Sequence, residues 1–145
     1  MAYVPKNAIW YWAEVIEEIG VEGDSRNVVH RNVVLIRADS PTEAYEKAIE
    51  IGKRYESSHQ NPEGALVQTR FRGLGGLDVI HDNLEHGAEL LYQEDIAVSQ
   101  EQIQKWVCPK DRLSLFGSEE GSDLRPDYGS KEVVAEVQKL MESQK

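Results

Sequence analysis

The sequence has little of what disulfide-rich, membrane-spanning or exported chains contain. Its 145 residues include a single cysteine, Cys108, which excludes an intrachain disulfide and a metal site built from several cysteines. No apolar run approaches the roughly 20 residues of a membrane-spanning helix. The N-terminal residues lack the basic start, apolar middle and small-residue cleavage site of a signal peptide. We therefore expect a cytoplasmic protein with no membrane partner.

Recognisable catalytic and cofactor-binding motifs are also missing. There is no Gly-x-Ser-x-Gly elbow, and Cys108 lies beside a proline without an evident histidine partner. Gly73–Gly76 follows a predicted strand but lacks the Gly-Lys-Ser/Thr ending of a phosphate loop. Asp78 stands where a dinucleotide fingerprint requires its third glycine, and its charge would repel a phosphate. We predict a β-bulge at these glycines, and we expect no cofactor.

Positive charge is scarce as well. The chain has 16 Lys and Arg against 26 Asp and Glu, a formal net charge of −10. Such an acidic surface repels phosphate backbones and anionic lipids, which disfavours nucleic-acid and membrane partners. It would suit a basic protein partner, although the same surplus also serves solubility.

What is present most clearly is a strand that runs into a capped helix, over residues 33–55. Ser40, Pro41 and Glu43 form the typical start of a helix: a cap, a proline in the first turn, and a capping-box acid. Ala44, Ala48 and Gly52 follow at four-residue spacing, so the inner side of this helix is narrow. We predict that its axis lies close to a sheet.

Other segments supply that sheet. An aromatic-rich strand over residues 9–21 and a strand over 28–38 enclose a polar turn and are most simply antiparallel. Residues 65–72 alternate cleanly between apolar and polar side chains, as a half-buried strand does. We also predict a loop at 57–64, a short strand or turn at 77–80, and a strand at 87–96.

The C-terminal third changes character. Ser99 and Gln102 predict a short capped helix ending at Cys108-Pro109. We divide the chain into an α+β core at 1–108, a linker at 109–129 and an amphipathic helix at 130–145. The fold class is therefore α+β: a single domain with an antiparallel sheet of four to five strands, one main helix on a face, a short second helix and a tethered C-terminal helix.

Two pairs of side chains are candidate binding residues. Trp10 and Trp12 share one face of the first strand and flank Tyr11 on the other, so the three aromatics cannot all enter one core. They predict either a second packed layer or a dimer interface. Arg70 and Arg72 share a strand face and could bind an acidic ligand. Pairing with carboxylates on neighbouring strands is the simpler expectation for them.

One loop carries potential metal ligands. On a helix, His81 would lie one turn from Glu85, and Asp82 would lie one turn from His86. Zinc or manganese could use such groups as ligands. The neighbouring Asn83 and Gly87 favour a turn instead, which leaves a solvated loop as the simpler expectation. The candidate ligands are His81, Asp82, Glu85 and His86.

The order of these segments resembles a known family. Its pattern is Trp10–Ala13 in a first strand, then Ala38–Pro41 leading into Ala44–Ala48, then Phe71–Leu74, and then Gly87–Leu90 before Ser99. It is similar to the small bacterial proteins grouped as domain of unknown function 4288, over roughly residues 9–107. The resemblance implies an α+β fold, and it brings no catalytic residue, cofactor or activity.

Two classes of function follow. The first is a non-enzymatic protein-interaction module, which we expect to be a homo-oligomer or an immunity-type antagonist of a basic protein. The aromatic first strand and the missing catalytic motifs favour it. The second is a small-molecule-binding or metal-dependent enzyme that uses the His81/His86 loop and the Arg70/Arg72 face.

Overall fold

The computed structural model describes residues 3–117 and 125–143. The chain forms two compact units, one of Met1–Leu91 with Pro126–Lys145 and the other of Tyr92–Arg125. The sequence places its boundaries elsewhere, after residues 108 and 129. The acidic pair Glu119-Glu120 of the predicted linker and the last two residues of the predicted helix lie outside the described residues.

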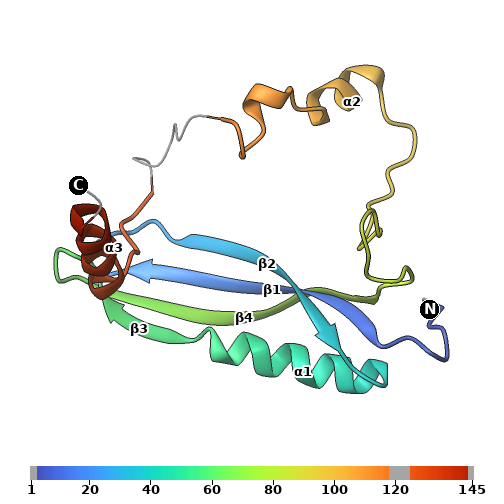
Figure 1. Cartoon of the computed structure of the whole chain (residues 1–145), viewed down its shortest axis with the longest axis horizontal. Helices are drawn as coiled ribbons and strands as arrows, with labels where there is room; N and C mark the ends of the chain where they lie inside the picture. The colour runs from blue at the N-terminus through green and yellow to red at the C-terminus, as the bar shows by residue number, and fades with distance from the viewer. Residues whose placement is uncertain (1–2, 118–124, 144–145) are drawn as a thin grey trace. The chain divides into compact units, whose positions relative to one another are not determined.

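The first unit is built on a four-stranded antiparallel sheet with the order β2-β1-β4-β3 (Figure 1). Its α+β architecture confirms the predicted fold class, with β1 and β2 joined as the predicted hairpin. The fourth strand, β3, is a correction, because the sequence predicts a loop there: its serines and glutamine carry no apolar alternation. The strands are β1 (Trp10–Val21), β2 (Val28–Arg37), β3 (Ser57–Gln60) and β4 (Leu66–Val79).

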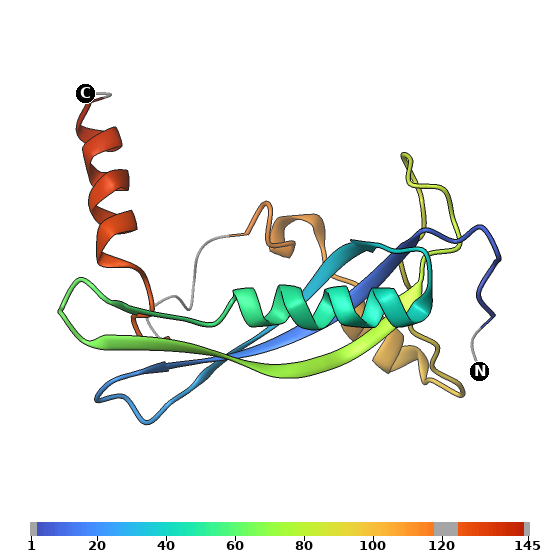
Figure 2. The same cartoon turned by 90° about the horizontal axis from the view of Figure 1, so that it is seen from below.

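Helix α1 (Pro41–Arg54) covers one face of this sheet and begins where the sequence predicts. The Ser40 Oγ accepts a hydrogen bond from the Glu43 N–H at 3.1 Å, and Pro41 lies in the first turn. In Figure 2 the helix lies in front of the strands. The buried residues on its inner side are the predicted small ones, Ala44, Ala48 and Gly52.

The core under α1 is formed by alternate residues of the strands. Tyr11 and Ala13 of β1 pack with Ile36 of β2, Val79 of β4 and the alanines of the helix. The Phe71 ring occupies the space that a side chain at Gly52 would need, so the close approach of helix and sheet depends on that glycine. Burial of this apolar surface is the main stabilising contribution to the unit.

Strand β4 is one strand of 14 residues, where the sequence predicts a strand at 65–72 and a short strand or turn at 77–80. Its register against β1 shifts twice, between Ile16 and Glu17 and between Glu14 and Val15. The shifts leave Arg72 and Gly75 of β4 without a partner residue on β1. These irregularities confirm the predicted bulge at Gly73–Gly76, and the φ of 132° at Gly73 is one that glycine adopts readily.

A second cover lies on the same sheet face beyond α1. Tyr128 packs against the buried cluster of Ile19, Val21 and Val67, and Pro126 is buried. The sequence assigns these residues to the end of a linker, yet they are packed on the sheet. The α1 side of the sheet is therefore covered at both ends. We call residues 126–129 the C-terminal strap.

The remaining helices carry exposed apolar side chains. Helix α3 (Lys131–Ser143) follows the strap within the predicted amphipathic segment, and its Val137 and Leu140 side chains are exposed. In the second unit, Ser99 caps α2 (Gln100–Trp106) as predicted, with its Oγ accepting from the Gln102 N–H at 3.2 Å, and a short 3-10 turn, η1 (Lys110–Arg112), follows. Within the described residues, no helix has the length and apolarity to cross a membrane.

The predicted strand at residues 87–96 is absent. The chain leaves the sheet after Ile80, and Gly87 turns it with a φ of 84°. Leu90 and Tyr92, which alternate as in a strand, are exposed and have no neighbouring strand. An alternating pattern predicts a strand only where the chain can pair with another, and this segment does not.

Candidate functional site

The face of the sheet opposite α1 carries exposed apolar side chains in the first unit. Alternate residues of β2 point there, and three of them are apolar and about half exposed, at 50%, 52% and 49%. Trp12 and Ile16 of β1 lie next to them on the same face and are partly buried. We call the three β2 residues the open-face stripe: Val29, Val33 and Leu35.

This open face carries charges of both signs beside the stripe. Arg31 makes a two-pronged contact with Glu14, at 2.8 Å and 3.3 Å. Glu18 accepts a hydrogen bond from the Asn27 side chain at 2.7 Å and lies 3.8 Å from Arg72. The face thus holds carboxylates and arginines in nearly equal number. The strand register places Glu14, Glu18, Asp78, Arg31, Arg37 and Arg70 there, and the ion pair with Glu18 places Arg72 there as well.

All four predicted binding residues lie on this face. Trp12 packs over Gly76, where a side-chain carbon would come within 2.8 Å of its ring. Trp10 lies near Arg37, whose guanidinium is 5.9 Å from the ring centre. Arg70 stands opposite Glu18 in the register, and Arg72 forms the cross-strand ion pair that the sequence favours. The tryptophans are therefore held in place and half covered by their neighbours.

The loop of candidate metal ligands forms an open hollow of about 380 Å³ past the end of β4. His81, Asp82, Glu85 and His86 all line it. One carboxylate has a structural role, because the Asp82 Oδ2 accepts the Glu89 N–H at 2.9 Å and closes the loop. In the part of the chain that the structure describes, no three His, Cys, Asp or Glu side chains are grouped so that they could hold a metal ion.

A second hollow, of about 210 Å³, is lined by residues from both the predicted binding set and the predicted metal-ligand loop. His81 and Asp82 line it together with Trp10 of β1 and Pro5. The other residues that line it are Asn7, Ala8, Ile9, Ile80, Asn83 and Leu84. The structure therefore places one predicted binding residue beside the predicted ligand loop, at the end of the sheet near the N-terminus.

A buried polar cluster, which the sequence does not predict, lies on the α1 side of the sheet. Glu17 is only 7% exposed and accepts a hydrogen bond from the Asn32 side chain. His30 lies 3.9 Å from the same carboxylate, and its ring meets the Tyr128 ring edge-on at 5.5 Å. Buried carboxylates need such partners. The only sequence signal was a charged residue within an otherwise apolar strand face.

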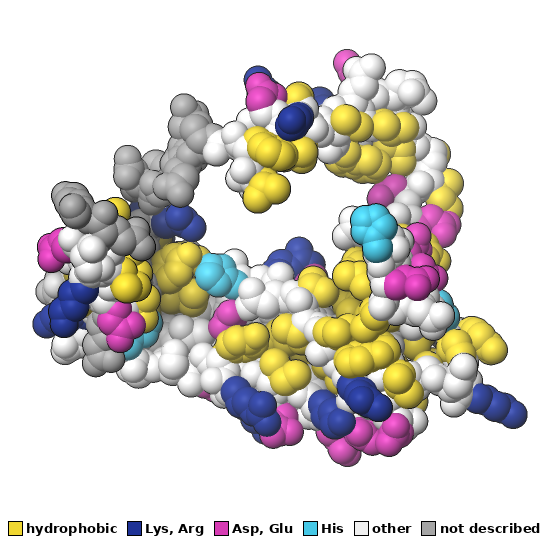
Figure 3. All heavy atoms as spheres, in the orientation of Figure 1, with side chains coloured by type: hydrophobic (Ala, Val, Ile, Leu, Met, Phe, Trp, Pro, Cys, Tyr) yellow, Lys and Arg dark blue, Asp and Glu magenta, His cyan; other side chains and the backbone are white. Residues whose placement is uncertain are grey.

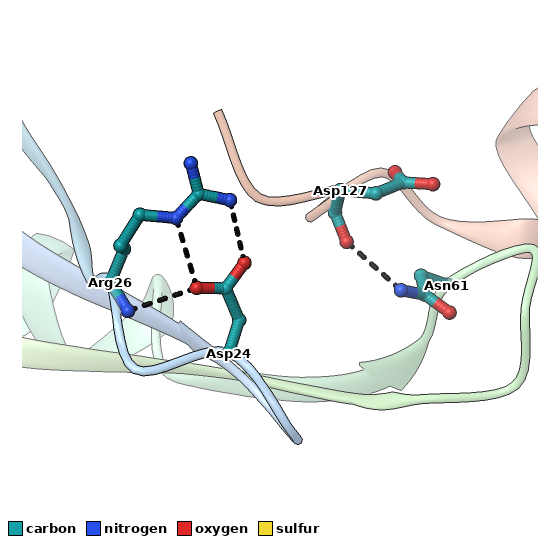
Figure 4. A network of polar contacts seen from close by, with 4 residues as sticks. All are labelled: Asp24, Arg26, Asn61 and Asp127. Atoms are coloured by element: carbon teal, nitrogen blue, oxygen red, sulfur yellow. Dashed lines mark hydrogen bonds and ion pairs between the residues drawn. The ribbon is translucent and has the colours of Figure 1, made fainter. Parts of the chain in front are cut away.

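The same region holds the C-terminal strap. The His59 Nε2 lies 3.0 Å from the Tyr128 carbonyl oxygen, so this nitrogen carries the proton and donates. The Asn61 side chain donates to the Asp127 carbonyl at 3.1 Å (Figure 4). Asn61 is 2% exposed and also accepts from the Ala65 N–H, so its amide joins the turn and the strap. These contacts hold the C-terminal strap on the sheet beside the buried polar cluster. We therefore interpret that cluster as structural.

The β1–β2 turn carries the largest electrostatic shift. Arg26 donates to the Asp24 carboxylate through its side chain, at 3.0 Å and 2.8 Å, and through its backbone N–H at 2.9 Å (Figure 4). Hydrogen bonds from the Arg26 side chain, and then from its backbone, lower the pKa of Asp24 from 3.8 to about 2. The pair is exposed and orders the turn.

The sequence reasoning missed the open-face stripe, although a signal was available. β2 reads VVHRNVVLIR, which is apolar on both sets of alternating positions. A strand that is apolar on both faces is typical of one covered on both sides. Figure 3 shows hydrophobic side chains gathered over the strands, whereas α1 presents charges of both signs.

Comparison with known proteins yields one match. The model of a family described as a domain of unknown function, DUF4288, matches residues 10–92. This range includes β1 to β4, α1 and the histidine loop, and it ends one residue after the last residue, Leu91, of the first unit's continuous segment. No curated protein and no solved structure matches the chain. The match covers more than half of the sequence, and the chain therefore belongs to the DUF4288 family.

Proposed function

We propose that this chain is a non-enzymatic protein-interaction module that works as a homodimer, with the open-face stripe as its contact surface. One observation carries the proposal: Val29, Val33 and Leu35 form a row of half-exposed apolar side chains on one strand. They continue the apolar surface of Trp12 and Ile16 on β1. Contiguous apolar surface of this kind, bordered by charges, is typical of protein interfaces.

The charges of this face favour a second copy as the partner. The chain carries a net charge of −10, so most contacts between two copies would be opposed by repulsion. The open face is the exception, since its carboxylates and arginines nearly balance. Arg31 is already neutralised by Glu14. A symmetric contact that brings the stripes of two copies together can cover them without placing like charges side by side.

A basic protein is a second candidate partner, and a different observation favours it. Residues 82–101 contain six carboxylates and no Lys or Arg. An acidic segment of this kind would steer a basic protein toward it, as an immunity-type antagonist requires. Binding of a basic protein encoded beside this chain, weakened by added salt, supports this candidate. Binding that is insensitive to salt contradicts it.

No comparable observation favours the enzymatic alternative. Arg70 and Arg72 lie on the open face of β4, before the loop of His81 and His86. Among the described residues, that loop does not bring three His, Cys, Asp or Glu side chains together so that they could hold a metal ion. The two predicted sets therefore do not converge in a single hollow.

The homodimer is tested by the mass of the full chain in solution. We expect size-exclusion chromatography with light scattering to give twice the chain mass of 16.4 kDa. Leu35→Glu should shift the protein to a monomer, because it places a carboxylate among the apolar side chains that the second copy would cover. Tyr45→Glu is the matched control, since Tyr45 is similarly exposed on α1 but lies outside the stripe. A wild-type monomer at all concentrations, or equal loss with the control, would overturn the proposal.

A further inference from the structure

Strand β2 is an edge strand, and only alternate residues of it bond to β1. The Ala38 N–H donates to the Ile9 carbonyl at 2.9 Å, one pair beyond the register pair Trp10–Arg37. Hydrogen-bonded pairs alternate along antiparallel strands, so the even-numbered residues of β2 bond to β1. The N–H and C=O groups of the odd-numbered residues therefore point away from the sheet. These residues are Val29, Arg31, Val33, Leu35 and Arg37.

An independent contact supports this assignment. The Lys47 side chain of α1 donates to the Arg37 carbonyl at 2.8 Å, so that carbonyl is open to a group outside the β1–β2 ladder. This contact occupies the outward carbonyl at one end of the β2 edge. Residues 29–35 are the stretch of that edge that remains for pairing with another strand. Within the described part of the chain, no backbone group outside β1 bonds to this stretch.

The two edges of the sheet differ in their protection. β3 has only four residues, and they are serine, histidine and glutamine. Natural edges are commonly blunted by such short polar strands, by proline or by bulges. β2 has ten residues, no proline, and ten successive pairs with β1 without a register shift. It is thus a long, regular and largely apolar edge, which favours addition of another strand.

We propose that two copies of this chain pair antiparallel along β2, about a two-fold axis at Asn32, and form one continuous eight-stranded sheet. This inference rests on the proposed homodimer and states how that dimer is built. The axis places Val29 opposite Leu35 of the second copy, and Arg31 opposite Val33 of the second copy. Every outward N–H and C=O of residues 29–35 then has a partner.

The side chains suit this register. On the open face, Val29 and Leu35 of different copies lie side by side, and Val33 lies beside the methylene groups of Arg31 of the other copy. These neighbours cover part of the exposed surface of the stripe. The two Arg31 residues lie diagonally apart rather than opposite, and each keeps its contact with Glu14. On the other face, α1 packs more on β4 and β1 than on β2, so space remains beside the edge for a second strand.

Residue-resolved amide exchange of the full chain tests the pairing. In an unpaired edge, the N–H groups of Val29, Arg31, Val33 and Leu35 exchange rapidly with solvent, while those of the residues between them are protected by β1. We expect the dimer to show continuous protection over 29–35 instead. Alternating protection in a dimer would overturn edge pairing.

A proline at the centre of the edge is the matching variant. Val33→Pro removes one outward N–H and leaves every bond from β2 to β1 in place. We expect the dimer to weaken about 10- to 100-fold, because the two-fold axis doubles the loss of one hydrogen bond. Ser58→Pro is the control. Because Asn61 bonds to Ala65, the Ser58 N–H also points outward, but at the β3 edge, and the dimer should persist.

The outcomes separate the two proposals. A dimer with continuous protection that is lost in Val33→Pro and kept in Ser58→Pro supports both. A dimer that is lost in Leu35→Glu but kept in Val33→Pro, with alternating protection, overturns edge pairing and leaves a face-to-face homodimer. A wild-type monomer at all concentrations overturns both. Unchanged circular dichroism confirms that each variant is folded.

Discussion

Both faces of the sheet carry apolar side chains, but the open face also carries several charged residues, and the two faces have different surroundings. On β2, Ile36 points under α1 and is 2% exposed, while its neighbour Leu35 points to the open face and is half exposed. The same alternation separates Tyr11 from Trp12 on β1. One face is covered by α1 and by the C-terminal strap, whereas neither of these two segments, as the structure describes them, covers the other.

This contrast shows that apolar content alone does not decide which residues form the core. The covered face is stabilised within the chain, whereas the open face keeps side chains of the same kind without a layer over them. Burial of such surface is favourable wherever a cover becomes available. The difference between the faces is therefore the basis for assigning the open one to association with a second chain.

The largest effect should separate the adjacent residues Ile36 and Leu35. Ile36→Ala removes a fully packed side chain under α1, and we expect it to lower the free energy of unfolding by about 2–5 kcal/mol. Leu35→Ala should change it by less than about 0.5 kcal/mol in the monomer, and should weaken the dimer. Urea unfolding of both variants at low protein concentration provides the measurement. Equal losses would remove the distinction between the faces.

The next largest effect concerns how closely the covered face is packed. Gly52→Val places a side chain where the Phe71 ring lies. We expect a loss of about 3 kcal/mol, because α1 or the ring must move. Thermal unfolding of this variant can be compared with that of Lys53→Ala, which changes the exposed side of the same turn. A loss no larger than in Lys53→Ala would show that α1 does not approach the sheet this closely.

The strap should contribute less than α1. Asn61→Ala removes an amide that donates to the strap and accepts from the β3–β4 turn, and we expect a cost of about 2 kcal/mol. Amide exchange near Tyr128 should also accelerate, since the strap loses the hydrogen bond from Asn61 to the Asp127 carbonyl. Gln60→Ala, at an exposed neighbouring position, serves as the control. Unchanged exchange at the strap would contradict its docking on the sheet.

The smallest effect on stability is expected from the Asp24–Arg26 pair in the β1–β2 turn, which lies outside both faces of the sheet. The folded pKa of Asp24 is about 2, below its ordinary value of 3.8, so its pairing with Arg26 stabilises the turn above pH 4. That contribution is lost as the pH falls from about 4 to 2. NMR titration should find the Asp24 midpoint near 2, and Arg26→Ala should return it toward 3.8. A midpoint near 3.8 in the wild type would exclude the pairing.

The covered face could be predicted well from the sequence because its signals are local. Ser40, Pro41 and Glu43 set the start of α1, and the spacing of Ala44 and Ala48 indicates close packing. Strand β3 and the absence of a strand at 87–96 could not be predicted, because strand formation depends on which segments meet. The strap was missed for the same reason, as Tyr128 reaches a sheet formed by residues far away in the sequence.

The candidate site could be predicted only in part. Trp10, Trp12, Arg70 and Arg72 do share one face, which follows from the two-residue period of strands. The sequence could not show that this face lacks a cover, since that depends on where α1 packs. The stripe on β2 became recognisable once Leu35 and Val33 were seen to point away from the helix.

The most direct test of the uncovered face is an isotope-filtered NMR experiment on mixed labelled and unlabelled chains. Such an experiment detects only contacts between different copies. A homodimer through the open-face stripe should give intermolecular contacts from the methyl groups of Val29, Val33 and Leu35, and none from Tyr45 on the outer side of α1. Intermolecular contacts confined to α1, or their complete absence at high concentration, would contradict it.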